Sequence, residues 1–374
     1  PMYDDPQPTP QCHRDWWELY CLDDPFAAIA APRGHAKSTA LTHDFALASA
    51  CFRVEPHILI VSATEELALA HLGDIAKELR DNDDLRREFR IQKFTVDSKS
   101  EIVVQCFQDG EYPTGYSFRI LARGAGQKLR GLKWRGRRPG LIICDDMEED
   151  EQVENFDRRR KFRRWVMRAL LPLGRRQCKM RWHGTIMHED SMLCRIMKDK
   201  TWTSKLYRAH RAFDDFRDIL WPEMWSEERL RRLRQSYIEQ GDAAGYSQEV
   251  LNDPFGQDSA YLRKDDFLPL RDEDRLADKR YAVGCDFAVS TNIRANRTSF
   301  TVGGQDALNT IQIVDQSDGR WDALEWIDEM FRLQKRYDPS AFFVEDGVIW
   351  KSVASSVYRE MNVRGSWMNL VPIA

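Results

Sequence analysis

The feature that most constrains this chain is a phosphate-loop pattern near its N-terminus. The apolar segment 26–30 runs directly into Ala31-Pro32-Arg33-Gly34-His35-Ala36-Lys37-Ser38-Thr39, and a helical stretch follows from residue 40 to residue 50. A strand, a tight loop ending in Lys-Ser and a helix are the context in which a P-loop binds phosphates. Backbone N–H groups and the helix N-terminus surround the phosphates, Lys37 reaches the β- and γ-phosphates, and the Ser38 hydroxyl binds Mg²⁺. The sequence therefore predicts a nucleotide site over residues 33–39.

Two alanines depart from the usual Gly-x-x-x-x-Gly-Lys-Ser pattern. Ala31 and Ala36 stand where the two glycines belong. Ala36 is the more serious departure, because this position can require a positive φ or a close approach of phosphate to the backbone. The motif favours a nucleotide site over a chance match, and it also allows a site of weakened activity.

The rest of the first half supports the same interpretation. Residues 57–62 and 179–183 are strand-like, and the apolar run 141–144 ends in Asp145-Asp146-Met147-Glu148. An apolar strand that ends in carboxylates is typical of a Walker B element, which places an acid beside Mg²⁺ and a base beside the attacking water. The alternative is a strand end followed by a solvated acidic loop. Strands that alternate with helices predict a parallel sheet with its ligand at the carboxyl ends of the strands.

The bulk composition indicates a soluble protein of two domains. A chain of 374 residues with 31% charged and 42% hydrophobic residues is too long for one ordinary core and too apolar for general disorder. No run approaches the roughly 20 apolar residues that span a bilayer, so we expect a cytoplasmic protein and no membrane partner. The 8 cysteines occur singly, which favours buried reduced thiols over a zinc or redox site.

Basic residues are concentrated locally, although the formal net charge is −4. The segment 119–138 carries eight Lys or Arg residues and no acid, and a second basic run occupies 158–164. Local basic patches on an acidic chain suit a protein that grips a polyanion such as DNA. For the second run, a merely solvated helix face is an equally good interpretation.

The second half predicts a different fold. Strand-like runs at 281–286, 298–303 and 310–315 precede a helix at 321–337, a fourth strand at 341–345 and a helix at 350–361. This is the element order of an RNase-H-like domain. Asp286 ends the first strand and Glu345 the fourth, where such folds place the acids that bind Mg²⁺ or Mn²⁺ in a two-metal phosphodiesterase site. The alternative is that each acid only ends a strand.

Two features of this half raise doubt about nuclease activity. The third acid of such nucleases comes later in the fold than Ala374, so we expect a domain that is truncated at its C-terminal end, with little cleavage of its own. Asn296 stands where similar segments often carry an acid. Together with Ala36, it indicates sites that are weakened or inactivated, and the sequence does not decide between these.

Several motifs in fixed order resemble those of phage terminase large subunits, the ATP-driven DNA-packaging motors of tailed phages. The resemblance covers nearly the whole chain, and the ordered set is far more specific than any single motif. The matching segments are 32–39, 126–133 (Gly-Gln-Lys-Leu-Arg-Gly-Leu-Lys), 138–148, 183–190 (His-Gly-Thr-Ile-Met-His-Glu-Asp), 220–223 (Leu-Trp-Pro-Glu) and 248–254 (Gln-Glu-Val-Leu-Asn-Asp-Pro).

The resemblance implies roles for individual residues. Arg33 would sense the γ-phosphate, Asp145 would be the Mg²⁺-associated acid, and either Asp146 or Glu148 would be the base. The pair Gly184-Thr185 would couple hydrolysis to motion. In this family an arginine from a neighbouring subunit can complete the site, and Arg130 is the candidate here.

The resemblance also implies an organisation and a set of partners. We expect a RecA-like (ASCE-type) P-loop ATPase domain over residues 1–205, a lid or linker over 206–272, and an RNase-H-like nuclease domain over 273–374. ATP with Mg²⁺ would be the cofactors. The partners would be double-stranded DNA, a portal protein, a small terminase subunit and further copies in a ring, in the cytoplasm of an infected bacterium.

Two other functions remain open at this stage. A helicase-like repair ATPase would need a second RecA-like domain, whose motifs the C-terminal half does not supply. A DNA-binding scaffold would carry degenerate P-loop and nuclease sites, and DNA-stimulated ATP hydrolysis would distinguish it from a motor.

Overall fold

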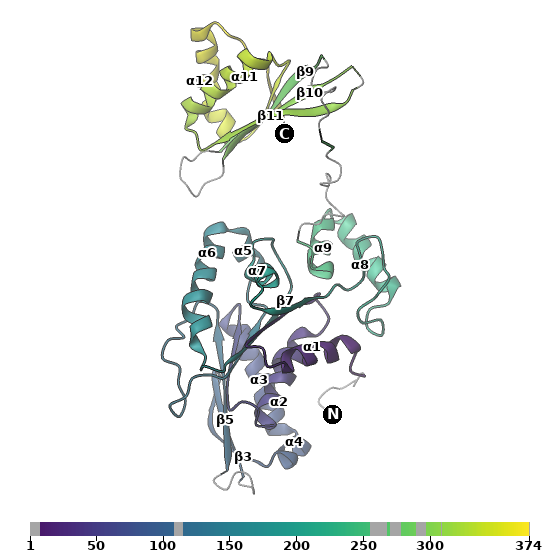
Figure 1. The fold of residues 1–374 in the computed structure, drawn as a ribbon, viewed down its shortest axis with the longest axis vertical. Coiled ribbons are helices and arrows are strands. Elements are labelled where there is room, and N and C mark those ends of the chain that lie inside the picture. Colours follow the sequence, from purple (N-terminus) through teal and green to yellow (C-terminus); the bar gives the residue numbers. More distant parts are fainter. Residues whose placement is uncertain are drawn as a thin grey trace. The chain divides into compact units, whose positions relative to one another are not determined.

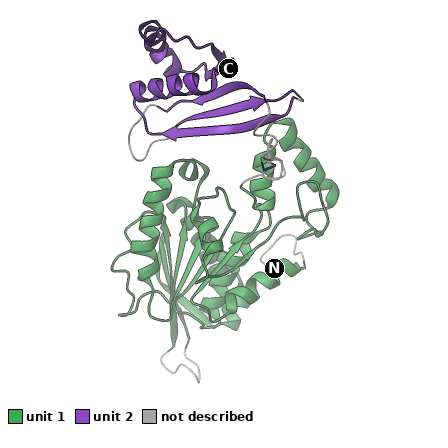
Figure 2. Ribbon diagram, turned by 45° about the horizontal axis from the view of Figure 1, so that its top comes forward, with its two compact units in different colours: residues 1–264 green, residues 265–374 purple. Residues whose placement is uncertain are grey.

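The computed structural model describes residues 8–107, 115–254, 268–269, 278–288, 297–307 and 309–373. The chain divides into two compact units, residues 1–264 and 265–374 (Figure 2). The predicted boundaries at residues 205/206 and 272/273 stay predictions. Asn296 lies outside the described residues.

Unit 1 is built on an eight-stranded sheet (Figure 1). Its strand order is β3-β4-β5-β2-β6-β7-β1-β8, and the strands from β5 to β8 in this order all run parallel. The remaining two strands form an antiparallel edge. The bounds are β1 (Phe26–Ala30), β2 (His57–Ser62), β3 (Ile91–Ser98), β4 (Glu101–Cys106), β5 (Tyr116–Gly124), β6 (Leu141–Asp145), β7 (Lys179–Gly184) and β8 (Thr203–Leu206).

A hydrophobic cluster covers each face of this sheet. Successive strand residues point to opposite faces and therefore enter different clusters. In β2, Ile58 and Ile60 enter one hydrophobic cluster, while Leu59 and Val61 enter the other. The first cluster includes residues of α1 (Gln11–Cys21), η1 (Ser38–Asp44), α2 (Phe45–Cys51) and α3 (Glu65–Asp81); α4 (Asp83–Glu88) follows α3. The second includes residues of α6 (Phe156–Trp165), η2 (Val166–Leu170), η3 (Leu171–Leu173) and α7 (Met192–Lys198), with α5 (Asp150–Glu154) preceding α6.

A smaller cluster lies in the segment that the sequence predicts as a lid. Helices α8 (Glu227–Glu239) and α9 (Ala243–Leu251) pack there around Tyr246, which is fully buried. The His210 ring hydrogen-bonds the Tyr246 hydroxyl at 2.6 Å. This segment therefore has a core of its own within unit 1.

The described part of unit 2 forms a five-stranded sheet with two helices. Its order is β11-β10-β9-β12-β13, with β10 antiparallel to both neighbours and β9, β12 and β13 mutually parallel. The sequence predicts the first four strands and both helices, but not β13. The bounds are β9 (Arg280–Asp286), β10 (Thr298–Gln305), β11 (Ile311–Gly319), α11 (Ala323–Tyr337), β12 (Phe342–Glu345), α12 (Val348–Arg364) and β13 (Leu370–Ile373).

The helices of unit 2 share one core with one face of the sheet. Trp326 of α11 and Trp350 of α12 join Val283, Cys285 and Val344 in that core. The alternate residues of β9 and β12 therefore point to the opposite face.

Two expectations from composition can be compared with the structure. No helix among the described residues is long and apolar enough to cross a membrane. The expectation of buried thiols is wrong for Cys21, which is exposed, and Cys178 is half-buried. It is confirmed for Cys12, Cys51, Cys106, Cys144, Cys194 and Cys285.

Candidate nucleotide and metal sites

The P-loop segment forms a tight loop between β1 and η1. Ala31 N–H donates to the carbonyl of Gly184 at 3.0 Å, which ties the loop to the end of β7. The buried Lys37 ammonium turns back across the loop and donates to Pro32 O at 3.2 Å and to Thr185 Oγ1 at 3.0 Å. Lys37 and Thr185, which the sequence analysis assigns to one site, are therefore in contact.

Ala36 occupies a glycine-like backbone conformation. Its φ is +54°, and Gly34 in the same loop has a φ of +73°. An L-residue in the left-handed region loses about 1–2 kcal/mol to the contact between Cβ and the following carbonyl. The expectation that this position needs a positive φ is confirmed, and the loop adopts that conformation with alanine in place.

Asp145 lies beside Ser38 at the end of β6. Ser38 Oγ donates to Asp145 Oδ1 at 3.1 Å. Two histidines flank the same carboxylate, with His183 Nε2 at 3.0 Å from Oδ1 and His71 Nε2 at 2.9 Å from Oδ2. Burial opposes ionisation of Asp145, but the charge and hydrogen bonds of His183 and His71 outweigh it and hold its pKa well below the usual range.

The two histidines were missed as site residues by the sequence analysis. His183 is held in turn by the Tyr20 hydroxyl at 2.9 Å and by Thr42 Oγ1 at 3.0 Å. His183 stands directly opposite Asp145 in the parallel pairing of β6 with β7, so the strand order would reveal this contact. His71 comes from the middle of α3, and no local pattern marks it.

Asp146 lies at the same edge of the sheet and has a φ of +37°. Its Oδ1 accepts a hydrogen bond from Thr185 N–H at 3.2 Å, and Thr185 Oγ1 also lies 3.3 Å from Ala31 O. Asp146 is exposed, and Thr185 joins it to Lys37. The geometry thus brings together an acid, a hydroxyl and an ammonium beside the loop.

Glu148 has different surroundings from Asp146. Its carboxyl oxygens accept hydrogen bonds from Met192 N–H at 2.8 and 2.9 Å and from Leu193 N–H at 3.2 Å, at the start of α7. Burial raises the pKa of Glu148 from 4.5 to about 7. Its contacts therefore place it at a helix terminus rather than at the P-loop.

The lid segment touches the loop at three successive residues, Arg33, Gly34 and His35. Arg33 Nη1 lies 3.1 Å from Glu249 Oε1, and Arg33 N–H donates to Glu249 O at 2.9 Å. Trp225 Nε1 donates to Gly34 O at 3.1 Å, while its ring system stacks on His35 with centroids 5.7 Å apart. Burial lowers the pKa of His35 to about 4, so the stacked ring is neutral near pH 7. Arg33, Gly34 and His35 are therefore all in contact with the lid segment.

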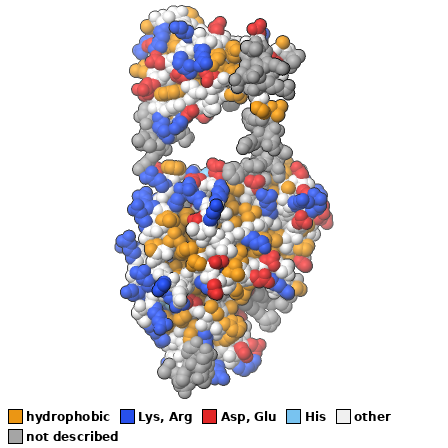
Figure 3. Space-filling model, in the orientation of Figure 1, with side chains coloured by type: hydrophobic (Ala, Val, Ile, Leu, Met, Phe, Trp, Pro, Cys, Tyr) orange, Lys and Arg blue, Asp and Glu red, His pale blue; other side chains and the backbone are white. Residues whose placement is uncertain are grey.

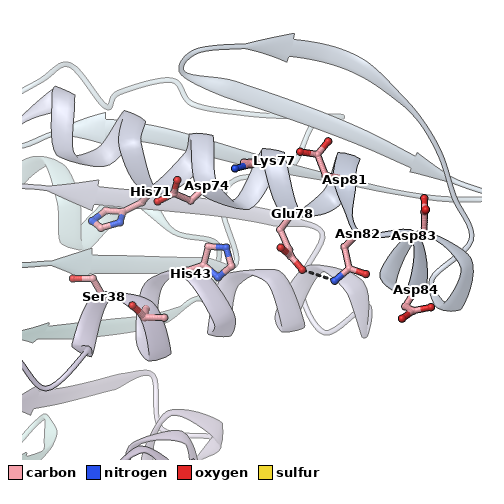
Figure 4. A pocket seen from close by; sticks show the side chains of 11 residues that line it. Ser38, His43, His71, Asp74, Lys77, Glu78, Asp81, Asn82, Asp83 and Asp84 are labelled. Atoms are coloured by element: carbon pink, nitrogen blue, oxygen red, sulfur yellow. Dashed lines mark hydrogen bonds between the residues drawn. The ribbon is translucent and has the colours of Figure 1, made fainter. Parts of the chain in front are cut away.

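A cavity of about 650 Å³ opens beside Ser38 and Thr39, between η1 and α3 (Figure 4). His43 and His71 also line it. The remainder carries acids of α3 and α4, which repel phosphate groups. We therefore expect phosphates beside Ser38 and not along the other side chains that line the cavity, Asp74, Lys77, Glu78, Asp81, Asn82, Asp83 and Asp84.

The first basic run divides into structural and exposed members. Arg119 is buried and its Nε lies 2.8 Å from Glu101 Oε1, so it holds β5 to β4. Arg130 is exposed and has no ion pair among the described residues. The other exposed cations of this run are Lys128, Lys133, Arg135, Arg137 and Arg138.

The acids of unit 2 end adjacent parallel strands. Val344 of β12 pairs with Cys285 of β9, so Glu345 and Asp286 stand one position beyond this pair. Both are exposed, while Val344 and Cys285 are buried, which puts the two acids on the face opposite the core. Asp286 and Glu345 thus share a face and a strand end. Among the described residues, no group of three or more His, Cys, Asp or Glu side chains is arranged to hold a metal ion.

Comparison with solved structures finds bacteriophage large terminases. The large terminase of a thermophilic bacteriophage is 10% identical over 98% of this chain and 82% of its own, with a TM-score of 0.44. The same terminase in complex with ADP matches over the same shares with a TM-score of 0.43. The ATPase domain of the Thermus phage P74-26 large terminase is 12% identical over 67% of this chain and 94% of its own, with a TM-score of 0.46.

No protein-family model matches the sequence, and no curated protein does. The structural matches are thus to phage large terminases, at low sequence identity.

Proposed function

We propose that unit 1 hydrolyses ATP as a RecA-like motor domain. The observation that carries the proposal is the set of contacts at the carboxyl ends of three neighbouring strands, β1, β7 and β6. Lys37 from the loop after β1 contacts Thr185 after β7, and Ser38 contacts Asp145 at the end of β6. Neighbouring parallel strands thus bring Lys37, Ser38 and Asp145 to one edge, where open α/β sheets bind ligands, which supports their assignment to a P-loop and a Walker B acid.

In this proposal each residue has a distinct task. The loop from Arg33 to Thr39 would surround the phosphates, and Lys37 would stabilise the charge on the transferred group. Ser38 and Asp145 would hold Mg²⁺, which would neutralise phosphate charge when bound. Asp146 is our choice for the base, because Glu148 is occupied by the N-terminus of α7. Arg130, exposed and without an ion pair among the described residues, would reach a neighbouring copy.

We further propose that unit 2 is an RNase-H-like nuclease domain. Its strand order, with three antiparallel strands followed by two parallel ones beside the first, supports this fold. Asp286 and Glu345 would hold Mg²⁺ or Mn²⁺, hard cations that prefer carboxylate oxygens. With two carboxylates instead of three, we expect weak metal binding.

The two activities together would form the large subunit of a DNA-packaging terminase. ATP hydrolysis would drive double-stranded DNA into a procapsid, with the portal protein, the small terminase subunit and a homo-oligomeric ring as partners. The nuclease unit would cut the concatemer. The ordered sequence motifs of unit 1, together with the strand order and the two acids of unit 2, support this combination.

The test of the motor is DNA-stimulated ATP hydrolysis by the full chain. Lys37→Ala should lower turnover at least about 100-fold, because removing one preorganised group that stabilises transition-state charge costs several kcal/mol. Lys93→Ala, an exposed lysine on β3, is the matched control and should hydrolyse ATP normally. Normal turnover by Lys37→Ala would refute the P-loop assignment, and inactivity of the unmodified chain would favour a degenerate scaffold.

The test of the nuclease unit is metal binding followed by NMR. Added Mn²⁺ should broaden the signals at the ends of β9 and β12, and Asp286→Asn or Glu345→Gln should abolish this broadening. Asp346→Asn is the matched control, because Asp346 lies next to Glu345 but pairs with Lys351 at 3.2 Å. Equal broadening in all variants would show that this pair of acids is not the metal site.

A further inference from the structure

The second basic run has an inner side and an outer side. On the inner side, Arg159 and Arg163 both pair with Asp190, at 3.3 and 2.9 Å, and so attach α6 to the segment before α7. On the outer side, Lys161, Arg164 and Arg168 are exposed, and none has an ion pair among the described residues. Lys161 and Arg164 lie on α6, and Arg168 lies on η2, which continues it. We call these three residues the α6 stripe.

The orientation of the stripe is fixed by packing on the opposite side of the helix. Phe162, Val166 and Leu170 are buried in the core of unit 1, at the spacing of one helix face. Residues three and four positions apart lie on one side of a helix, so the three cations project together away from that core. Lys161 and Arg168 are separated by about 10 Å along the axis, at roughly 1.5 Å per residue. This distance spans about three phosphates of one DNA strand, at a rise of about 3.4 Å each.

Further exposed cations adjoin the stripe. Trp165 Nε1 donates to Gln127 O at 3.0 Å, so the loop that carries Lys128 lies against α6. Arg138 Nη1 donates to Pro172 O at 3.0 Å, which attaches the far end of the same loop beyond η2. Figure 3 shows Lys and Arg side chains gathered along the side of unit 1 that carries α6. The acids of α5 limit this surface at the N-terminal end of α6.

We propose that the α6 stripe, together with Lys128, binds the phosphate backbone of duplex DNA without reading its sequence. The inference rests on the proposed function, because it assigns a surface to the DNA that the motor would move. Charge complementarity carries it: three aligned cations on a chain of net charge −4 have no acidic partner within the described residues. Phosphate contacts of Lys and Arg position DNA, and they carry no sequence information.

The experiment measures binding of the full chain to a duplex of random sequence over a series of salt concentrations. The stripe variant carries Lys161→Gln, Arg164→Gln and Arg168→Gln. The slope of log K against log salt is negative, and each lost phosphate contact reduces its magnitude by about 0.9. The slope of the stripe variant should therefore be less steep by about 2 to 3. The control variant removes the same charge from other elements, through Lys93→Gln on β3, Lys200→Gln after α7 and Arg232→Gln on α8.

The control should keep the slope of the unmodified chain, and equal slopes for both variants would overturn the proposal. If the stripe instead contacts an acidic protein, or is only a solvated face, the stripe variant would keep the slope of the unmodified chain. This result too would overturn the proposal. Thermal unfolding and ATP hydrolysis without DNA are measured on all three proteins, and both should be unchanged. Absence of hydrolysis in all three would refute the motor, while the comparison of slopes would still decide on the stripe.

Discussion

Replacing Glu148 with Gln should stabilise the protein relative to the unmodified chain, and this gain in stability should be larger at pH 8 than at pH 5. Burial raises the pKa of this carboxyl from 4.5 to about 7 in the folded protein. Between these two values the folded chain holds a proton that the unfolded chain has released. The free energy of unfolding therefore falls as the pH rises through this window. Below pH 4.5 both states hold the proton, and Glu148 gives the free energy of unfolding no pH dependence.

The size of the effect follows from the shift. A change from 4.5 to about 7 at about 1.36 kcal/mol per pH unit costs at most roughly 3 kcal/mol above pH 7. Gln has the shape of the protonated acid and keeps an oxygen for the N–H groups of Met192 and Leu193. The variant and the unmodified chain should therefore have the same free energy of unfolding near pH 4.5. At pH 8 that of the variant should be higher by about 1 to 3 kcal/mol, because the variant no longer places a charge in a low-dielectric site.

Urea unfolding at the two pH values measures this difference, with Glu149→Gln as the control. Glu149 is exposed and adjacent in sequence, so its replacement should change stability little at either pH. ATP hydrolysis by Glu148→Gln should stay within a few-fold of normal, because Asp146 is our choice for the base. A pH-independent effect on stability would refute the argument from burial. Loss of ATP hydrolysis in a stable variant would make Glu148 the base instead.

Two further predictions concern the loop and the first basic run. Ala36→Gly should raise the free energy of unfolding by about 0.5–1 kcal/mol, because relief of the left-handed conformation exceeds the entropy cost of glycine; a lower urea midpoint would contradict this. Loss of three exposed arginines should weaken DNA binding similarly for all sequences and flatten its salt dependence, and an unchanged slope would mean that this loop faces something else, such as a neighbouring subunit. The three replacements are Arg135→Ala, Arg137→Ala and Arg138→Ala.

The sequence was sufficient to predict the parts of the fold that depend on local periodicity. The apolar runs that became β1, β2, β6 and β7 are short, bounded by turn residues and almost entirely buried, as expected in the middle of a parallel sheet. The sequence did not predict β13, because its four residues include Pro372 and proline disfavours a strand except at a sheet edge or a bulge. β13 is such an edge strand.

Contacts between distant segments could not be predicted in this way. His71 contacts Asp145 from α3, and Trp225 contacts Gly34 although 191 residues separate them in the sequence. Neither residue stands in a local pattern that marks it, since histidine and tryptophan are common in ordinary cores. Such contacts follow only once the strand order is known, as the pairing of His183 with Asp145 illustrates.

The acids after β6 show why a motif cannot assign chemical roles by itself. Asp145 and Glu148 are separated by two residues, yet their surroundings move their pKa values in opposite directions. The flanking histidines keep Asp145 ionised in spite of burial, which suits a group that holds a cation. Burial favours the protonated form of Glu148 instead, and it outweighs the N–H groups of Met192 and Leu193 and the charge of Arg163. Environments that separate two carboxyl groups in this way distinguish their functions. Asp146, exposed and joined through Thr185 to Lys37, is therefore the carboxylate that we propose as the base.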